Sequence, residues 1–514
     1  MSRDLLLSPA CLSGRVKVPP SKSVAHRALL CAALAGGGSS MVRNIAPSDD
    51  ILATLGGAAA LGARMEWQGD AIVVHAAASR GAVDIEPALI DCKESGSTLR
   101  FLLPVALALG RPVRMTGRGN LGNRPLDAYF VILREQGIPF EAAEGRLDLT
   151  LRGRLRPGVF RLPGNVSSQY ITGLLLALPL LDGPSRIVVE GPLESKGYLD
   201  LTLQVMRAFG AGVSHDAYRV FEVKPGGYCP ADYTVEGDYS QAAFFLAAGA
   251  LAGVRRSLLG DGGSPGDFPA FSGQPGVAPG GRPTGLGKET AAPGQDVPPA
   301  CGGAVTGAPS PEEGAGSPAG GEAVSPTGTL LRVAGLRRDS AQGDRAVCDI
   351  LRRMGAAVEW DAAGDLICTA YQLHGCVIDA AQYPDIIPVL AAVACACEGE
   401  THIVNAGRLR IKECDRLHAV ASELSALGAA VREGADDLRI AGRPAGGFPL
   451  RGGGRVWSHG DHRMAMTLAV AAAVCEQPFV LKDYPCVSKS YPGFFEDYRR
   501  LGGAFDELEL GNQM

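Results

Sequence analysis

The residues of this chain best suited to chemistry are basic side chains in short turns of small and hydroxyl residues. The first turn, residues 19–27, reads Pro-Pro-Ser-Lys-Ser-Val-Ala-His-Arg and runs into the apolar segment 28–34. Lys22 and Ser23 lie where a helix should begin, and Arg27 follows one turn later. A helix N-terminus offers free N–H groups and partial positive charge, so this turn predicts a site for a phosphate or carboxylate. An ordinary serine cap beside two solvated cations explains this one segment equally well.

Recurrence of the pattern favours the anion site. Similar turns lie at residues 94–100, 122–125, 164–169, 195–198, 383–385, 408–416, 459–466 and 487–492. Small residues let backbone N–H groups approach an anion, and arginine can bind a carboxylate or phosphate through two bonds. Two phosphates and two carboxylates would carry a charge of about −6. A comparable positive charge comes from Lys22, Arg27, Arg124, Lys412, Arg416, Arg463 and Lys489. We therefore expect these cations to converge on small, highly charged ligands.

The bulk composition argues against several other classes of protein. The chain has 514 residues, of which 46% are hydrophobic and 20% charged, and its net charge is −5. This is the balance of a globular protein, with no electrostatic reason to expect nucleic acid or an acidic membrane as a partner. The apolar runs are shorter than the ~18 residues of a membrane span, and the N-terminus is too short in apolar residues for a signal peptide. The 13 scattered cysteines include no Cys-x-x-Cys pair, so we expect a cytoplasmic protein with reduced thiols, and a monomer.

A short pattern returns six times: the end of an amphipathic segment, a glycine, and then a strand-like segment. The glycines are Gly62, Gly137, Gly210, Gly355, Gly428 and Gly502. Each is typical of a residue that ends a helix, because glycine adopts positive φ at little cost. Successive copies lie about 74 residues apart, except that the interval from Gly210 to Gly355 is roughly double. The order of helices and alternating strands predicts an α/β fold of six units, arranged as two lobes of three units with a cleft between them.

The long interval coincides with a change in composition. Residues 261–330 are rich in glycine and proline, and their only aromatic residues are Phe268 and Phe271. Such a segment cannot bury enough apolar surface to offset the entropy lost on ordering. We interpret residues 256–329 as a disordered insertion in a surface loop, where closure entropy grows slowly with length.

Five motifs, taken in order, resemble the 5-enolpyruvylshikimate-3-phosphate synthase family of enolpyruvyl transferases. They are residues 20–23 (PSKS), 167–169 (SSQ), 411–416 (IKECDR), 461–466 (DHRMAM) and 489–492 (KSYP). The resemblance covers nearly all of the chain outside the insertion. It implies a two-lobed fold in which each lobe has three βαβαββ units, an inside-out α/β barrel. The chain would start in one lobe, build the other and return, so that residues 21–236 form one lobe and residues 1–20 with 237–514 the second, which carries the insertion.

The resemblance also implies a reaction. Members of this family move the enolpyruvyl (carboxyvinyl) group of phosphoenolpyruvate to the 5-hydroxyl of shikimate 3-phosphate and release phosphate, on the route to aromatic amino acids. Addition needs a base near the hydroxyl and an acid that protonates C3, which gives a tetrahedral intermediate, and elimination then reverses the transfer at C3. Fixed cations would stabilise the charges. No cofactor or metal is implied, and His459 and His462 are poorly suited to a metal because Arg463 adjoins them.

Position by position, the matched motifs imply substrate contacts. The shikimate 3-phosphate site would comprise Lys22, Ser23, Arg27, Ser167, Ser168, Gln169, Ser195, Tyr198, Asp385 and Lys412. The phosphoenolpyruvate site would comprise Lys22, Gly96, Arg124, Gln169, Arg416, Arg463 and Lys489. Lys22, Lys489, Asp385 and Glu413 would be catalytic. Of these, Asp385 would hydrogen-bond the attacking hydroxyl, and Glu413 would exchange a proton with the methylene carbon.

The chain departs from the family's pattern at three places. Residues 94–97 read Glu-Ser-Gly-Ser where members often have Asn-Ala-Gly-Thr, and Phe101 stands where they often have proline. A family asparagine in the substrate site aligns with Arg408. The resemblance therefore assigns no role to Glu94 or Arg408, and it does not predict sensitivity to the family's inhibitor glyphosate.

Three alternatives remain open on the sequence. The related transferase that acts on UDP-N-acetylglucosamine usually has a reactive cysteine before the Arg-Pro pair, and residues 115–123 contain none. A dinucleotide oxidoreductase would account for the G-x-G-x-x-G at residues 117–122, but Arg124 and Pro125 would start the helix after the third glycine. A non-catalytic anion-binding protein of the same fold would not need Asp385 and Glu413 beside the lysines.

Overall fold

Six small sheets make up the strands of this protein. The computed structural model describes residues 3–76, 86–260, 330–443 and 447–508, and these belong to one compact unit. Each sheet has four strands, of which two pair in parallel and the other two add in antiparallel fashion. The same strand order recurs in all six sheets, so the predicted six units are six copies of one βαβαββ arrangement.

Three of the sheets belong to the first lobe, here in spatial order. They are β14 (Asp232–Thr234), β3 (Ser39–Arg43), β5 (Ala71–His75), β4 (Arg64–Gln68); β6 (Ala88–Asp91), β7 (Val113–Thr116), β9 (Asp148–Leu151), β8 (Phe140–Ala142); and β10 (Val159–Pro163), β11 (Ser185–Glu190), β13 (Val220–Val223), β12 (Val213–Asp216). The helices of this lobe are α1 (Lys22–Leu34), α2 (Asp49–Ala60), α3 (Gly96–Leu109), α4 (Asp127–Glu135), α5 (Ser168–Ala177) and α6 (Lys196–Ala208). Strand β14 returns from the far end of the lobe to complete the first sheet.

The second lobe repeats this plan. Its sheets are β2 (Gly14–Lys17), β15 (Leu331–Ala334), β17 (Leu366–Thr369), β16 (Ala357–Trp360); β18 (Val377–Asp379), β19 (Glu400–Val404), β21 (Leu438–Ala441), β20 (Ala430–Glu433); and β22 (Arg455–Trp457), β23 (Phe479–Lys482), β1 (Asp4–Ser8), β24 (Ala504–Leu508). Its helices are α7 (Tyr239–Leu259), α8 (Ala346–Arg353), α9 (Ile387–Cys395), α10 (Arg416–Ala426), α11 (His462–Ala471) and α12 (Phe494–Arg500). The N-terminal strands β1 and β2 thus complete sheets of the C-terminal half.

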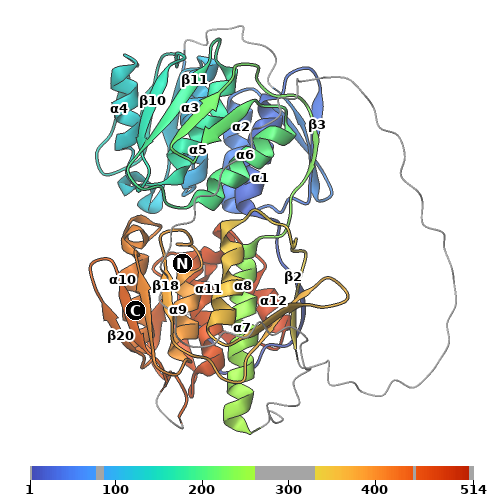
Figure 1. Cartoon of the computed structure of the whole chain (residues 1–514), viewed down its shortest axis with the longest axis vertical. Helices are drawn as coiled ribbons and strands as arrows, with labels where there is room; N and C mark the ends of the chain where they lie inside the picture. Colours follow the sequence, from blue (N-terminus) through green and yellow to red (C-terminus); the bar gives the residue numbers. More distant parts are fainter. Residues whose placement is uncertain (1–2, 77–85, 261–329, 444–446, 509–514) are drawn as a thin grey trace, which may run out of the picture. The chain divides into compact units, whose positions relative to one another are not determined.

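Two separate hydrophobic cores underlie the lobes. One is built from side chains between Val24 and Val235, and the other from side chains between Leu5 and Val18 and between Tyr239 and Leu501. On this basis we keep the proposed boundaries, residues 21–236 for the first lobe and residues 1–20 with 237–514 for the second. Figure 1 shows α1, α3 and α5 in the upper half and α7, α9 and α11 in the lower half.

The repeat glycines have the conformation that the sequence predicts. They follow α2, α4, α6, α8, α10 and α12, and their φ angles lie between 65° and 101°. Because this region of φ is strained for residues with a Cβ, glycine lets each helix end and the chain reverse into the next strand. The interpretation of these six positions as helix terminators is confirmed.

Helix α7 corrects one predicted boundary. The insertion was expected to begin at Arg256, but α7 continues through Arg256 to Leu259. The rest of the proposed insertion, residues 261–329, lies outside the described residues. By length and composition α7 could cross a membrane, yet 72% of its most apolar window is buried inside the protein. Its apolar surface is covered by β17, α9 and α11, as expected for the central helix of a lobe.

In each lobe three helices are buried on nearly all sides: α1, α3 and α5 in the first lobe, and α7, α9 and α11 in the second. Almost all residues of α3, α5, α9 and α11 are buried. Helices α2, α4, α6, α8, α10 and α12 each have an exposed face, as amphipathic outer helices do. The first residues of α1, α3, α5 and α11 line one pocket, described next, so that the positive ends of several helix dipoles face it.

Candidate active site

One polar pocket brings together nearly all the side chains that the sequence analysis singled out. The predicted residues that line it are Lys22, Ser23, Arg27, Gly96, Arg124, Ser167, Ser168, Gln169, Ser195, Tyr198, Asp385, Lys412, Glu413, Arg416 and Arg463. Lys489 lines an adjoining pocket, but its Nζ lies 3.7 Å from Oε1 of Glu413. The expected convergence of the seven cations is therefore present in the structure.

Helix caps hold the lining residues at the pocket. Ser167 accepts a hydrogen bond from the Gln169 N–H at the start of α5, and Asp461 accepts one from the Arg463 N–H at the start of α11. Asp238 caps α7 and also accepts a bond from the Lys22 N–H, 3.1 Å away. Such caps satisfy N–H groups that the helix leaves unpaired. The side chains at these helix starts are fixed by their own backbones.

A pair of arginines lies against a glycine on the first-lobe side. Arg100 donates to Oε1 of Gln169 at 2.9 Å and to the carbonyl of Pro125 at 3.0 Å. A Cβ at Gly96 would lie 2.5 Å from Nη1 of Arg124 and 2.9 Å from Nη1 of Arg100. This position therefore has to be small, because any side chain would push both guanidinium groups.

The side chain of Arg27 bonds to protein groups, although the sequence predicts that it contacts a substrate. All three of its side-chain nitrogens donate to protein oxygens, on Ser23, Thr172, Tyr198 and Thr202. The side chain is buried, and burial lowers the pKa of its guanidinium to about 10. Arg27 lines the pocket, but in this structure its bonds join α1 to α5 and α6.

Asp385 is surrounded by donors. Its Oδ1 accepts from Nη1 of Arg416 at 2.8 Å and from Nζ of Lys412 at 3.4 Å. Its Oδ2 accepts from the Tyr198 hydroxyl at 2.7 Å and lies 3.3 Å from Nη2 of Arg463. Burial acts to raise the pKa of this carboxyl, but Arg463, Lys412 and Arg416 outweigh it and hold the pKa well below its usual range. Asp385 is thus ionised, with its oxygens crowded by positive charge.

Arg416 is the centre of a buried ion network. It donates through Nε to Asp461 at 2.6 Å, through Nη2 to Glu413 at 2.6 Å, and through Nη1 to Asp385. Its side chain is 1% exposed and that of Asp461 is fully buried. Burial would lower the pKa of this guanidinium, but the three carboxylates raise it well above its usual value. The predicted phosphoenolpyruvate ligand Arg416 therefore has its hydrogen bonds directed at protein carboxylates.

Glu413 faces three cations. Its Oε2 accepts from Arg416, and its Oε1 lies 3.7 Å from Nη1 of Arg124 and 3.7 Å from Nζ of Lys489. Burial alone would raise the pKa of this carboxyl, but Arg416, Lys489 and Arg124 together hold it well below its usual range. Glu413 is ionised in this structure, as a proton acceptor must be.

The lysines differ in their surroundings. Lys22 Nζ pairs with Oδ2 of Asp50 at 2.7 Å. Burial lowers the pKa of Lys412 to about 8, although Asp385 opposes the shift. The pKa of Lys489 is raised because Glu413 and Asp50 outweigh its burial. Lys412 therefore loses its charge more easily than Lys489.

Arg408, to which the resemblance assigned no role, bridges the two lobes. From the 3-10 turn η5 (Gly407–Ile411) it donates to Oε2 of Glu194 at 3.0 Å, to Oγ of Ser195 at 2.9 Å and to the carbonyl of Val166. Ser195 itself has a left-handed backbone, φ 56°. Arg408 therefore adds a cation to the serine-lined side of the pocket. Glu94, the other unassigned residue, lies 3.7 Å from Lys489.

Several residues of the site received no role in the sequence analysis. Arg100, Asp50 and His462 line the pocket, and Asp344 and Asp461 support it. Burial, with the nearby cations Lys22 and Arg463, holds the pKa of His462 well below its usual value. A search for cations and hydroxyls at helix starts cannot find such acids, although Asp461 occupies the cap position before α11, which is a recognisable signal.

The oxidoreductase alternative fails on local geometry. Residues 119–123 form the 3-10 turn η1 (Gly119–Asn123), and α4 begins only at Asp127. A dinucleotide site would need a helix that starts within the glycine motif. Among the described residues, no group of three or more His, Cys, Asp or Glu side chains is placed to hold a metal ion.

Comparison with protein families agrees with this geometry. The family model described as EPSP synthase (3-phosphoshikimate 1-carboxyvinyltransferase) matches residues 7–256 and 315–498. The chain belongs to the EPSP synthase family. The resemblance read from its five motifs is thereby confirmed, and the gap in the match falls within the proposed insertion.

Relatives in the EPSP synthase family span the whole chain. A 3-phosphoshikimate 1-carboxyvinyltransferase of Clostridium beijerinckii is 43% identical, over 99% of this chain and 99% of its own. One of Clostridioides difficile is 42% identical with the same coverage. Among solved structures, EPSP synthase of Acinetobacter baumannii superposes with a TM-score of 0.69 at 22% identity, over 99% of this chain and 100% of its own. The enolpyruvyl transferase NikO of Streptomyces tendae gives 0.67 at 18% identity, over 99% of both chains. These structural likenesses confirm the two-lobed enolpyruvyl transferase fold.

Proposed function

We propose that this protein transfers the enolpyruvyl group of phosphoenolpyruvate to the 5-hydroxyl of shikimate 3-phosphate and releases phosphate, as a 3-phosphoshikimate 1-carboxyvinyltransferase. Family membership and the full-length relatives support the reaction. The single structural observation that carries it is the pocket in which Asp385 and Glu413 lie among the cations of both lobes. Two carboxylates for proton transfer and fixed cations for charge are what the addition–elimination chemistry requires.

The serine-lined side of the pocket suits the phosphate of shikimate 3-phosphate. Ser167, Ser168 and Ser195 lie at helix starts, and Arg408 supplies a nearby charge. Neutral donors with the positive end of a helix dipole bind phosphate without needing a counter-ion to be displaced. We assign this role to Ser23, Ser167, Ser168, Gln169, Ser195 and Lys412, with Arg27 holding α1, α5 and α6 in register behind them.

The opposite side suits phosphoenolpyruvate. Arg124, Arg463 and Lys489 approach Glu413 or Asp385. A phosphate and a carboxylate entering here would compete with Glu413 and Asp385 for these cations, and would add negative charge of their own. Both changes raise the pKa of the two carboxyls from their low values in the free protein.

Exchange of ionic partners explains how Glu413 could serve as an acid. In the free protein it is ionised; with phosphoenolpyruvate bound, its pKa rises, so that it can bind a proton and deliver it to C3. After addition it takes one proton back from the methyl group at C3 during elimination. Asp385 would accept the hydrogen of the 5-hydroxyl as the C–O bond forms.

The test is phosphate release from phosphoenolpyruvate by the purified full-length chain. We expect release that depends on shikimate 3-phosphate, with UDP-N-acetylglucosamine as the contrasting acceptor. Release with the sugar nucleotide but not with shikimate 3-phosphate would overturn the proposal in favour of the related transferase. Release without any acceptor would show hydrolysis in place of transfer.

We also propose that the enzyme acts as a cytoplasmic monomer. No disulfide joins the cysteines in the described part of the chain, which suits a reducing compartment. The pocket is lined by residues of a single chain from both lobes, so catalysis needs no second copy. Sedimentation at working concentration should give one species of the chain's mass. A specific activity, that is, activity per mole of enzyme, that rises with protein concentration would contradict this.

A further inference from the structure

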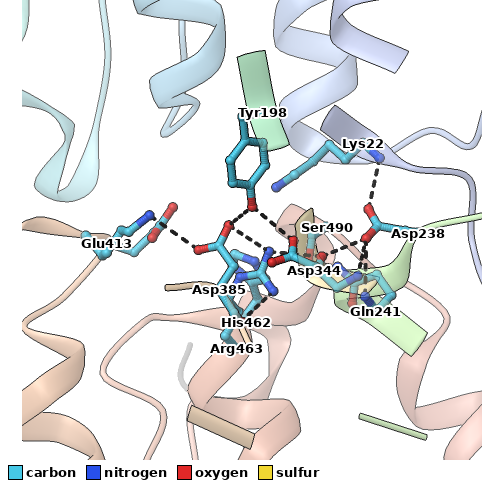
Figure 2. Close-up of polar contacts among 12 residues, drawn as sticks. Lys22, Tyr198, Asp238, Gln241, Asp344, Asp385, Glu413, His462, Arg463 and Ser490 are labelled. Atoms are coloured by element: carbon cyan, nitrogen blue, oxygen red, sulfur yellow. Dashed lines mark hydrogen bonds and ion pairs between the residues drawn. The ribbon is translucent and has the colours of Figure 1, made fainter. Parts of the chain in front are cut away.

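A buried carboxyl that the proposed mechanism does not use lies one side chain behind Asp385. Asp344, in the 3-10 turn η4 (Gly343–Arg345), has its Oδ2 3.0 Å from the Tyr198 hydroxyl. The same hydroxyl lies 2.7 Å from Oδ2 of Asp385. Figure 2 shows the Tyr198 oxygen between the two carboxyls, with Arg463 beside Asp385.

This arrangement contains fewer protons than it needs if both acids are ionised. A phenol has one hydrogen to donate, and an ionised carboxylate can only accept. Tyr198 can therefore bond both acids only when one of them carries a proton and donates it to the phenol oxygen. Otherwise the Tyr198 oxygen and one carboxylate oxygen would lie 2.7 Å or 3.0 Å apart with no hydrogen between them.

The surroundings decide which acid is protonated. Asp385 has Lys412, Arg416 and Arg463 within ion-pair distance. Asp344 is 5% exposed, makes no ion pair among the described residues, and its Oδ1 has no hydrogen-bond partner there. The charged groups that face it are Asp385 and Asp238, which disfavour its ionisation, and Arg463, which favours it, alongside the Tyr198 phenol. Burial and then Asp385 raise the pKa of Asp344 to about 7. The proton belongs on Asp344.

We propose that Asp344 is a positioning residue that exchanges protons with Asp385 through the Tyr198 hydroxyl, and so holds the proton that leaves the 5-hydroxyl of the acceptor substrate. The inference rests on the proposed function. Asp344 contacts neither the pocket nor the reacting atoms directly, and it acts through the two residues in front of it.

The transfer balances as three hydrogen movements. The 5-hydroxyl O–H breaks as its oxygen bonds to C2 of phosphoenolpyruvate, and Asp385 gains that hydrogen. Asp385 gives a hydrogen to the Tyr198 oxygen while Tyr198 gives its own to ionised Asp344. Tyr198 and Asp385 return to their starting states, and Asp344 holds one proton, which leaves again after phosphate is expelled. No oxidant or further reactant is needed.

The ionisation of Asp344 sets the direction in which activity changes with pH. Asp344 can accept a proton only when it is ionised, so activity should rise with pH through its pKa, about 7. The value of kcat/KM reports the free enzyme. Asp344→Asn removes the acceptor but keeps an N–H donor for the phenol. We expect the rise of kcat/KM with pH, the rising limb of the profile, to disappear in this variant. We also expect kcat to fall roughly 10²-fold, the low end of what a proton-transfer group contributes, with both KM values nearly unchanged. A limb caused by ionisation of the substrate's own phosphate would remain in the variant.

Two further variants separate the relay from a structural effect. Tyr198→Phe keeps the ring but breaks the chain of hydroxyls, and should also lose the limb. Asp349→Asn, at an exposed acid on α8 with 77% side-chain exposure, is the matched control and should keep it. A variant that is merely less stable would change the melting temperature without moving the midpoint near pH 7. A limb near pH 7 that persists in Asp344→Asn would overturn the proposal.

Infrared spectroscopy of the substrate-free protein tests the protonated acid without any turnover. We expect the carbonyl band of a buried carboxylic acid at pH 6 that fades with a midpoint near 7 and is missing in Asp344→Asn. If that variant does not fold, Tyr198→Phe should shift the band, because the acid loses its acceptor. A wild-type spectrum without the band would refute the inference, whereas absence of turnover in wild type would refute the proposed function alone.

Discussion

The two sides of the pocket use positive charge differently. On the first-lobe side, serine hydroxyls, Gln169 and helix starts surround the cations, and one acid, Asp50, pairs with Lys22. On the second-lobe side, Asp385, Glu413 and Asp461 are tied to Arg416 in a dense buried network. The first arrangement can bind an anion without changing any protonation state. The second has its charges balanced in advance, so a bound anion must change the pKa values of its acids. The comparison indicates that the first-lobe side binds and the second-lobe side transfers protons.

The strongest way to break this comparison is a change at Glu413. Glu413→Gln keeps the size and the hydrogen-bonding atoms but removes the exchangeable proton. We expect kcat to fall by roughly 10²- to 10⁴-fold, because a general acid–base group is lost, while KM for shikimate 3-phosphate stays within a few-fold. Steady-state kinetics measures both. A loss below about tenfold would place proton transfer at C3 elsewhere.

The second-lobe network should also carry stability. Asp461→Ala removes one of the three carboxylates that pair with the buried Arg416, and breaking a buried ion pair costs about 3–5 kcal/mol. Chemical denaturation measures the loss. The control is Asp232→Ala, which cuts the exposed pair with Arg43 and should leave the unfolding midpoint nearly unchanged. Equal effects of the two substitutions would mean that the network contributes no more than a surface pair.

Gly96 connects the two sides, because it touches the arginine that faces Glu413. In Gly96→Ala the added methyl group must push Arg124, at a cost of about 1–3 kcal/mol. We expect KM for phosphoenolpyruvate to rise by about 5- to 150-fold to match, with KM for shikimate 3-phosphate little changed. Gly56→Ala is the matched control, since a Cβ there meets nothing within 4 Å. A larger effect on shikimate 3-phosphate than on phosphoenolpyruvate would reverse the assignment of the two sides.

The smallest effect should come from the first-lobe side alone. Ser168→Ala removes one neutral hydroxyl from the start of α5, and a hydrogen bond of this kind contributes about 0.5–1.5 kcal/mol. We expect KM for shikimate 3-phosphate to rise a few-fold and kcat to stay near wild type. A fall in kcat with unchanged KM would show that this side also takes part in the chemistry.

More of the first-lobe side than of the second-lobe side could be predicted from the sequence. The repeat glycines predicted six units because a helix end with positive φ favours glycine at that one position, which can be recognised in the sequence. Lys22 and Ser167 were found because a helix start is also recognisable from a few neighbouring residues. The pairing of Arg416 with Asp385 and the place of Asp344 beside Tyr198 were missed, because these contacts join residues 31 and 146 positions apart. The end of α7 was placed too early because the helix runs on through Arg256 to Leu259, directly up to the glycine- and proline-rich composition that begins at residue 261.

The most direct test of the account is a crystal structure of Asp385→Asn, slowed in proton removal, with both substrates bound. The account predicts the phosphate of shikimate 3-phosphate against Ser167 and Ser168, and phosphoenolpyruvate against Arg124, Arg463 and Lys489 with its methylene carbon next to Glu413. Substrates bound with these sides exchanged, or away from the pocket between the two lobes, would contradict it.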